Sequence, residues 1–290
     1  MLRTNGKCRF GWLPDFPDAR DYSVNHEEVR PLLKKVGVLK ADRSALPKKA
    51  DLRKWCAPIE DQGNLGSCTA HAGVGMVEYY QQKAYGKHID ASRLFLYKVT
   101  RELMHEQGDS GAFLRSTMGA MTLFGVPPEE YWPYDVNGFD AEPPAFCYSF
   151  AQSYRSIKYV RLDSQGLDSK GLLSQIKSNL AAALPAMFGF TCYSTIEQAQ
   201  DGKIPYPLPK EKVVGGHAVL AVGYDDGLAI KNPYGGRATV GALLIRNSWG
   251  AGWGEGGYGW LPYDYVLNGL AVDWWSLISN EWVDTGEFKL

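Results

Sequence analysis

Residues 242–258 read ALLIRNSWGAGWGEGGY, and this stretch predicts a buried strand followed by a glycine-rich segment. Its first part, Ala242 to Ser248, is a dense aliphatic run typical of a buried strand. Its second part alternates glycine with tryptophan, and thirteen of the 32 glycines lie between Gly215 and Gly259. Such clustering indicates tight turns and close backbone approach. Asn247 ends the predicted strand, so its amide can orient a neighbouring side chain there.

The side chain that Asn247 is best placed to orient is His217. This histidine opens a second buried run, HAVLAVGY over 217–224, directly after two glycines. An amide oxygen at Asn247 can accept a hydrogen bond from the imidazole and fix its tautomer, and Trp249 can shield that bond from water. A satisfied core histidine is the alternative interpretation. The other histidines fit an acid/base role less well: His71 on a predicted helix, His26 near the N-terminus, and His88 and His105 in polar, loop-like contexts.

Cys68 stands where the turn GNLGS, residues 63–67, gives way to a predicted helix over 68–85. Ser67 is a candidate N-cap, and Gly86 is a candidate C′ residue. Backbone N–H groups and the helix dipole favour negative charge at such a position, which lowers the pKa of a thiol. A buried structural cysteine is the alternative. The Gln62 amide and the Cys68 backbone N–H can converge on one developing oxyanion.

Composition narrows the class of protein. The 290 residues carry a formal net charge of −1 and are 45% hydrophobic, as expected for a globular protein with one large domain or two lobes. Balanced charge gives no reason to expect nucleic acid as a partner. No signal-type or membrane-spanning apolar stretch is evident, so we expect a cytoplasmic protein or one exported without a recognisable signal. The five cysteines are too sparse for a disulfide scaffold, and their odd number leaves at least one thiol free.

The chain divides into an arm and two lobes. Residues 1–45 are rich in proline and charge yet carry large apolar groups, so we expect an arm that docks on the protein, with one short helix within 27–38, rather than a disordered tail. Residues 46–145 look mainly helical, and residues 146–290 mainly β. Helices are predicted over 68–85, 92–105, 113–124 and 171–180, and strands over 154–162, 185–191, 217–224, 242–248 and 257–261.

Three blocks, Gln62 to Cys68, Gly216 to Val219 and Asn247 to Tyr258, resemble the papain family of cysteine proteases in motif and in order. The resemblance spans about residues 46–275. It implies an α+β papain-like fold of two lobes, one helical and one an antiparallel β-barrel-like sheet, with the active-site cleft between them. Residues 108–112 resemble the segment that binds substrate backbone and shapes the S2 pocket.

Carried over by position, the resemblance implies that Cys68 is the nucleophile, His217 the acid/base, Asn247 its orienter and Gln62 the oxyanion donor. The implied reaction is peptide hydrolysis through a thioester, with no metal or cofactor. We expect an endopeptidase that acts as a monomer on peptide or protein substrates. The implied substrate-binding residues are Ser110, Gly111, Ala112, Gly216, Ala218 and Trp249.

The sequence also departs from the family pattern. Leu65 and Asp109 stand where many members have a disulfide pair, which suggests a reducing compartment or a bacterial lineage. Thr69 follows the nucleophile where tryptophan is usual. Gly216 stands before the predicted acid/base where Asp or Asn is frequent, and Ala112 stands where the substrate-binding segment usually has a second glycine. Only about 45 residues precede the enzyme, where zymogens of the family usually have a long helical prodomain. We expect this arm to lie across the cleft as an intramolecular inhibitor.

Two other functions stay open on the same scaffold. An exopeptidase or acyl transferase is the first, since fold does not fix the reaction. An inactive peptide-binding module is the second, although the presence of Cys68, His217, Asn247 and Gln62 argues against it.

Overall fold

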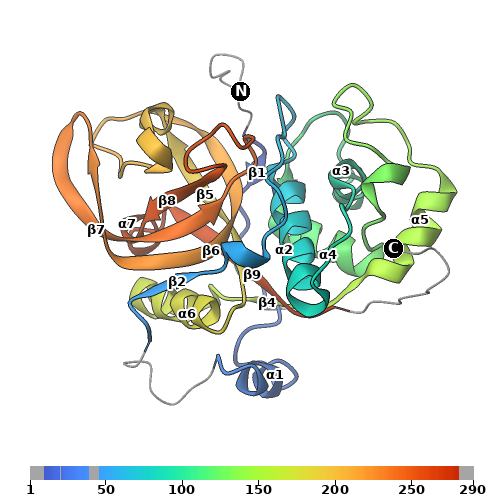
Figure 1. The fold of residues 1–290 in the computed structure, drawn as a ribbon, viewed down its shortest axis with the longest axis horizontal. Coiled ribbons are helices and arrows are strands. Elements are labelled where there is room, and N and C mark those ends of the chain that lie inside the picture. The colour runs from blue at the N-terminus through green and yellow to red at the C-terminus, as the bar shows by residue number, and fades with distance from the viewer. Residues whose placement is uncertain (1–9, 20, 39–45, 281–290) are drawn as a thin grey trace.

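A computed structural model describes residues 10–19, 21–38 and 46–280. It has a helical lobe and a β lobe side by side, with the first strand of the arm between them (Figure 1). The α-helices are α1 (Arg30–Lys35), α2 (Cys68–Tyr85), α3 (Arg93–Leu103), α4 (Leu114–Leu123), α5 (Ala145–Ala151), α6 (Ser169–Ala181) and α7 (Tyr263–Leu267). The strands are β1 (Trp12–Leu13), β2 (Lys49–Asp51), β3 (Ala112–Phe113), β4 (Ser156–Arg161), β5 (Ala186–Tyr193), β6 (Val213–Asn232), β7 (Gly235–Arg246), β8 (Tyr258–Pro262) and β9 (Ala271–Asn280).

Helix α2 is the central element of the helical lobe, and its bounds match the prediction. Gly86 ends it with φ +70°, a left-handed conformation that glycine adopts without steric cost. The expected Ser67 cap is wrong, because the Ser67 side chain makes no capping hydrogen bond. Its hydroxyl instead contacts the Tyr134 hydroxyl at 2.6 Å. The helix start is therefore held by packing and by the loop before it.

The β lobe is a seven-stranded sheet in the order β4-β9-β5-β6-β7-β8, with β2 also paired to β6. All these pairings are antiparallel. β6 has 20 residues, far more than predicted, because it continues past a register shift between Asp225 and Ala229 into a long hairpin with β7. The sheet places the start of β6 and the end of β7 next to the N-terminus of α2.

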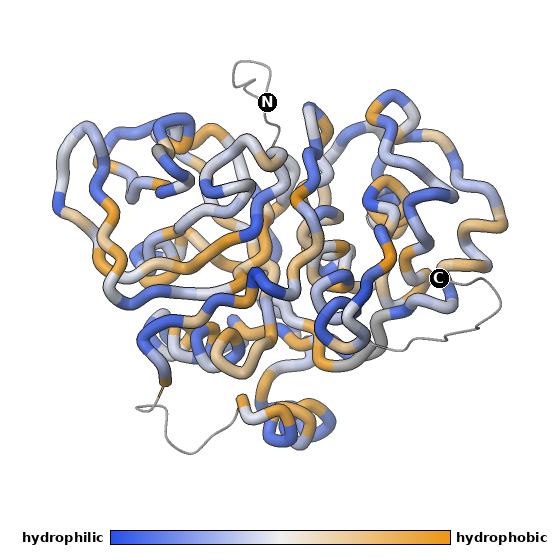
Figure 2. The backbone as a smooth tube through the Cα atoms, viewed as in Figure 1, coloured by the Kyte–Doolittle hydropathy of each residue, from blue (hydrophilic) through white to orange (hydrophobic). Residues whose placement is uncertain are grey.

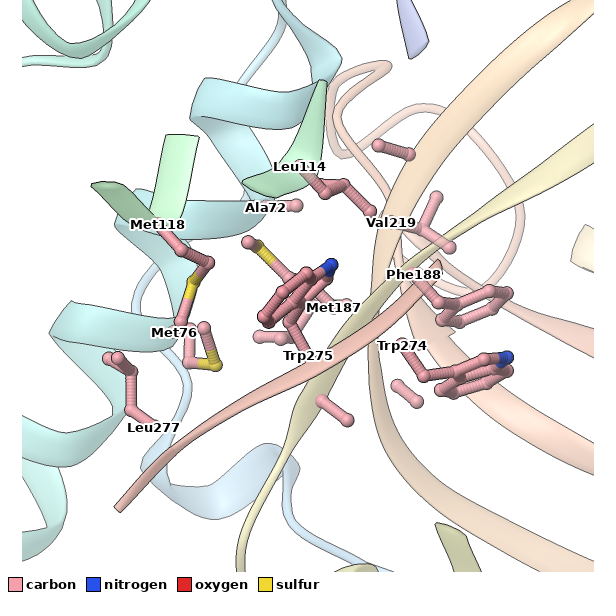
Figure 3. Close-up of a cluster of buried hydrophobic side chains, with 14 of the residues drawn as sticks. Ala72, Met76, Leu114, Met118, Met187, Phe188, Val219, Trp274, Trp275 and Leu277 are labelled. Carbon is pink, nitrogen blue, oxygen red and sulfur yellow. The ribbon is translucent and has the colours of Figure 1, made fainter. Parts of the chain in front are cut away.

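One apolar core joins the two lobes. Side chains from α2 and α4, including Met76 and Met118, face side chains from β5 and β9 (Figure 3). Phe188 and Trp274 stack with ring centroids 3.9 Å apart. A shared core of this kind fixes the lobes relative to each other, because packed interiors resist sliding.

The arm docks in two separate places. β1 runs parallel to β3, and farther along, Ser23 bridges to Arg161 beside β4. The second part ends in α1, where hydrophobic and hydrophilic residues alternate along the tube (Figure 2) and Leu33 is fully buried. The docked arm that the sequence predicts is thus present over 10–38, apart from residue 20. Within the described ranges, no helix is long and apolar enough to cross a membrane.

Candidate active site

The Cys68 thiol lies at the first residue of α2 and is fully buried. Its Sγ accepts a hydrogen bond from the Ala218 N–H at 3.4 Å, which brings β6 directly against the helix start. The backbone N–H of Gly11 in the arm also acts on the sulfur and favours the thiolate, which lowers the pKa. The thiol therefore sits at the junction of the helical lobe, the β lobe and the arm.

His217, directly before Ala218, is oriented as the sequence predicts. Its Nε2 and the Asn247 Oδ1 are 2.8 Å apart. Trp249 stacks on the imidazole with ring centroids 4.6 Å apart and an interplanar angle of 24°. The other ring nitrogen, Nδ1, is buried and has no hydrogen-bond partner among the residues that the structure describes. Nδ1 is thus the ring atom left for a thiol or a substrate.

Burial keeps both groups neutral in this state. Loss of solvent raises the pKa of the Cys68 thiol to about 11, although backbone N–H groups of Ala218, Gly11 and Thr69 act in the opposite direction. Loss of solvent also lowers the pKa of His217 to about 4, against the effect of its bond with Asn247. The predicted lowering of the Cys68 pKa by the helix N-terminus is therefore outweighed here, because no water reaches the sulfur.

Gln62 is fully buried in the loop before α2 and is tied to the strand end that carries Asn247. Its backbone N–H donates to the Ser248 carbonyl at 2.8 Å. Its Oε1 accepts from the Ser248 hydroxyl at 2.6 Å, and its Nε2 donates to the Leu65 carbonyl at 2.9 Å. These bonds fix the Gln62 amide within the loop that precedes Cys68, and they attach that loop to the β lobe.

Residues 10–12 of the arm pack where the two lobes meet, and we call this place the arm groove. The arm contacts Gly66, Gly111 and Ala112 on one side and Gly215, Gly216 and Trp249 on the other. Gly11 packs so tightly here that a Cβ on it would overlap the Gly66 carbonyl, and a Cβ on Gly111 would overlap the Gly11 carbonyl. The Ala112 N–H donates to the Gly11 carbonyl at 2.8 Å.

The predicted substrate-binding residues all border this groove or the segment behind it. Gly111 has φ +78°, and Gly216 faces Trp12 of the arm. The Ser110 hydroxyl donates to the Gly111 carbonyl at 2.9 Å, within its own turn. Asp109 stands in place of the usual half-cystine, and its Oδ1 accepts from the Gly66 N–H at 2.9 Å. That hydrogen bond joins the two segments that a family disulfide would join.

The other described histidines do not reach Cys68 through any hydrogen bond. His71 is buried with Nδ1 3.1 Å from the Ser67 carbonyl and its ring against Tyr134. Burial and the charge of Arg93 lower its pKa to about 3. His26 lies in the arm, and His88 lies beside Gln82. His105 lines a surface pocket. His217 is the histidine that the fold brings to the thiol.

The sequence did not predict two sets of contacts at the site, those of Phe10 and those of Trp12. Phe10 contacts His217 and Trp249, with ring centroids 6.2 and 6.3 Å apart. Trp12, on the other side of Gly11, donates from Nε1 to the Asp273 Oδ2 at 3.0 Å. The unusual aromatic content of residues 10–16 was the only available signal for the arm contacts, and Asp273 lies in a strand that was not predicted.

A thiol at a helix N-terminus, an imidazole held by an amide and a covering tryptophan define a thiol hydrolase site. The family model of the papain family cysteine proteases matches residues 46–269, and the chain belongs to this family. It is a cysteine peptidase.

Several known proteins are similar to it. An uncharacterized peptidase C1-like protein, L477, of Acanthamoeba polyphaga mimivirus is 31% identical, over 92% of this chain and 85% of its own length. Xylellain, a cysteine protease from Xylella fastidiosa, is 32% identical with a TM-score of 0.75, over 98% of this chain and 99% of its own. Bromelain from Ananas comosus, solved with the inhibitor E64, shares the fold at 18% identity and a TM-score of 0.57, over 82% of this chain and 100% of its own.

Proposed function

We propose that this protein is a cysteine endopeptidase whose nucleophile is Cys68 and whose acid/base is His217. The supporting observations are the 2.8 Å contact of His217 Nε2 with the Asn247 Oδ1, the buried Nδ1 that has no partner among the described residues, and the hydrogen bond from the adjacent Ala218 N–H to the Cys68 Sγ. An amide that holds one ring nitrogen leaves the other to exchange a proton with substrate or thiol.

In the proposed reaction, the Sγ proton passes to His217 Nδ1 and the thiolate attacks the substrate carbonyl carbon. The C–S bond forms, the C–N bond breaks, and His217 gives its proton to the leaving amine. Water, deprotonated by His217, then attacks the thioester and releases the acid. The Gln62 amide and the Cys68 backbone N–H are the proposed donors to the oxyanion. Asn247 is the proposed positioning residue.

The course of the arm favours an endopeptidase. Phe10 lies on the Trp249 side of the thiol, and Trp12 lies on the side of β3 and Asp273, so the described part of the arm spans both sides of the thiol. An exopeptidase needs one end closed against a substrate terminus. The position of the arm also supports its role as an intramolecular inhibitor, since Gly11 bonds to the Ala112 N–H and Phe10 packs on His217 and Trp249.

The test is labelling of the full-length protein with a peptidyl epoxide, followed by digestion of a long peptide. We expect labelling on Cys68, none in Cys68→Ala, and internal cleavage products. Cys56, a half-buried free thiol, is the matched control, and Cys56→Ala should label normally. Labelling that persists in Cys68→Ala, or products released only from one terminus, would contradict the proposal.

A further inference from the structure

His71 is a buried histidine of α2 that the proposed reaction does not use. Its ring packs against Tyr134 with centroids 5.0 Å apart. Its Nδ1 lies 3.1 Å from the Ser67 carbonyl oxygen and 3.3 Å from the Ser67 hydroxyl. Burying an imidazole removes two nitrogens from water, which an apolar side chain of similar size would not do. The contacts with Ser67 are therefore the feature that distinguishes His71 from an ordinary core residue.

The surroundings of the His71 ring decide where its proton lies. Burial and the charge of Arg93 lower the pKa of His71 to about 3, so the ring is neutral at neutral pH and carries a single N–H. A carbonyl oxygen only accepts hydrogen bonds, so this N–H is on Nδ1 and points at the Ser67 carbonyl. Nε2 keeps the lone pair and has no hydrogen-bond partner among the residues that the structure describes. His71 is thus a donor to Ser67.

The Ser67 carbonyl belongs to the same peptide unit as the Cys68 N–H, one of the two proposed oxyanion donors. A peptide unit is planar and trans, so its C=O and N–H point in opposite directions and turn together. The Ser67 oxygen accepts from the His71 backbone N–H at 3.1 Å as well as from Nδ1. Two donors from one residue therefore fix this carbonyl, and by fixing it they aim the Cys68 N–H. Donation to the carbonyl also polarises the amide, which strengthens its N–H as a donor.

The residue that carries the other proposed donor, Gln62, is joined to Ser67 through two hydroxyl groups. The Tyr134 hydroxyl donates to the Gln62 carbonyl at 3.0 Å and lies 2.6 Å from the Ser67 hydroxyl. Because the single proton of Tyr134 is used on the carbonyl, the Ser67 hydroxyl donates to Tyr134. This direction agrees with the tautomer of His71, whose Nδ1 offers no lone pair to that hydroxyl. One ordered set of hydrogen bonds thus holds both ends of the loop 62–67.

We propose that His71 is a positioning residue of the oxyanion hole and acts through the peptide between Ser67 and Cys68. Tyr134 assists it by holding the Gln62 end of the same loop. The inference rests on the proposed function, in which Cys68 is the nucleophile. Bonds to the oxyanion strengthen in the transition state, so a misdirected donor slows acyl transfer more than it weakens substrate binding. Loss of the His71 donor should therefore lower kcat and leave KM nearly unchanged.

The test compares two reactions of Cys68 in the full-length protein. Hydrolysis of a fluorogenic peptide amide passes through an oxyanion. Alkylation by iodoacetamide joins the sulfur to a saturated carbon and releases iodide, so no oxyanion develops. Both reactions need an accessible sulfur, so their ratio does not depend on how often the arm opens. We expect His71→Phe, which keeps a ring but no donor, to lower kcat about 10- to 100-fold, with KM and the alkylation rate within about threefold.

Three further variants assign the effect to these hydrogen bonds. His71→Asn should recover most of the lost kcat, because its amide nitrogen is as many bonds from the backbone as Nδ1 and carries N–H donors. Tyr134→Phe should lower the ratio of hydrolysis to alkylation by about three- to tenfold, as for one neutral hydrogen bond. The matched control is Tyr224→Phe, which removes another buried tyrosine hydroxyl, bonded to the Pro47 carbonyl, and should leave the ratio unchanged. Thermal unfolding checks each variant, and His71→Leu replaces His71→Phe if the larger ring prevents folding.

The outcomes separate this inference from the proposed function. If Cys68→Ala hydrolyses the peptide as fast as the wild type, the proposed nucleophile is wrong and the positioning role falls with it. If Cys68→Ala is inactive but His71→Phe hydrolyses the peptide at the wild-type rate, the positioning role alone is overturned. An equal loss of hydrolysis and alkylation in His71→Phe, or a loss that His71→Asn does not recover, would also overturn it.

Discussion

The two halves of the arm dock by different physical means. Residues 10–13 lie in the arm groove and bind through backbone hydrogen bonds and one buried indole. Residues 22–38 bury apolar side chains in the common core, among them Val24, Val29, Leu33 and Val38. Each of these contributes about 1.5–3 kcal/mol when fully buried. Residues 22–38 therefore pack as part of the domain, whereas residues 10–13 contact the groove as a bound peptide would.

This difference suggests that the arm opens in part. We propose that the groove half leaves while the α1 half stays in place as a tether, which would make the proposed inhibition reversible without cleavage. Between the two halves, Asp15, Phe16 and Asp21 contact two arginines of the body. Arg115 Nε donates to the Asp15 Oδ2 at 2.6 Å, and Arg161 Nη2 donates to the Asp15 carbonyl at 2.8 Å. Three parts of the arm can therefore be tested separately. Residues 10–13 in the arm groove are the plug, the contacts of Asp15 and Asp21 with the two arginines are the clamp, and residues 22–38 are the anchor.

Removing the plug should give the largest effect. Trp12→Ala in the full-length protein is expected to accelerate epoxide labelling of Cys68 by about 100- to 4,000-fold, since truncating a buried tryptophan costs about 3–5 kcal/mol and each 1.4 kcal/mol is a factor of ten. The matched control is Phe16→Ala, whose side chain is 84% exposed on the same arm. Equal rates for Trp12→Ala and the wild type would show that the groove half does not restrain the site.

The pH dependence of the thiol tests the same closure without a substrate. Because burial raises the pKa of Cys68 to about 11, the thiol is protonated at neutral pH while the arm is docked. Alkylation of Cys68 by iodoacetamide, followed by mass spectrometry, should rise about tenfold per pH unit from pH 7 to 10. In Trp12→Ala, the rate should level off at lower pH. Identical profiles would contradict a pKa raised by the arm.

Weakening the clamp should have a smaller effect. The Asp21 side chain is 9% exposed and pairs with Arg115 and, at 3.5 Å, with Arg161. Asp21→Asn is expected to raise the labelling rate by about three- to tenfold, as for loss of one partly buried charged contact. The control is Glu28→Gln, which breaks the exposed pair with Lys158 in the α1 half. An equal increase in both variants would mean that the arm responds to charge in general.

Disturbing the anchor should change labelling least. Leu33→Ala is expected to lower the free energy of opening of residues 22–38 by about 2–5 kcal/mol, measured by hydrogen exchange. Labelling of Cys68 should change by less than about threefold, because distant sites act independently. An acceleration as large as that of Trp12→Ala would show that the two halves leave together, and the tether would be wrong.

Local patterns predicted the helix that carries the thiol and the strands that carry His217 and Asn247. Helix α2 ends at Gly86 because a left-handed residue is needed there, and that signal is local. β6 was underestimated because its apolar run ends at Tyr224, whereas the strand continues past a register shift between Asp225 and Ala229. β9 was not predicted, because Asp273 interrupts the apolar run of its sequence. In the structure, Asp273 has a left-handed φ of +61° within the strand.

The features that depend on contacts far apart in sequence could not be predicted. The helix N-terminus argued for a lowered pKa at Cys68, but burial of the sulfur in the folded chain outweighs that effect and raises the pKa. The contacts of Trp12 with Gly216 and Asp273 join segments far apart in sequence, and no local pattern predicts them. The motif order indicated the catalytic groups, while the geometry of the arm came only from the folded chain.

The buried sulfur has a chemical consequence beyond inhibition. Peroxide oxidises thiolates much faster than thiols, and the first product, a sulfenic acid, goes on to irreversible states when oxidant persists. With the arm docked, Cys68 is neutral and has no exposed surface. If the arm restrains the site as proposed, the same segment would protect the Cys68 thiol from oxidation as well as from substrates.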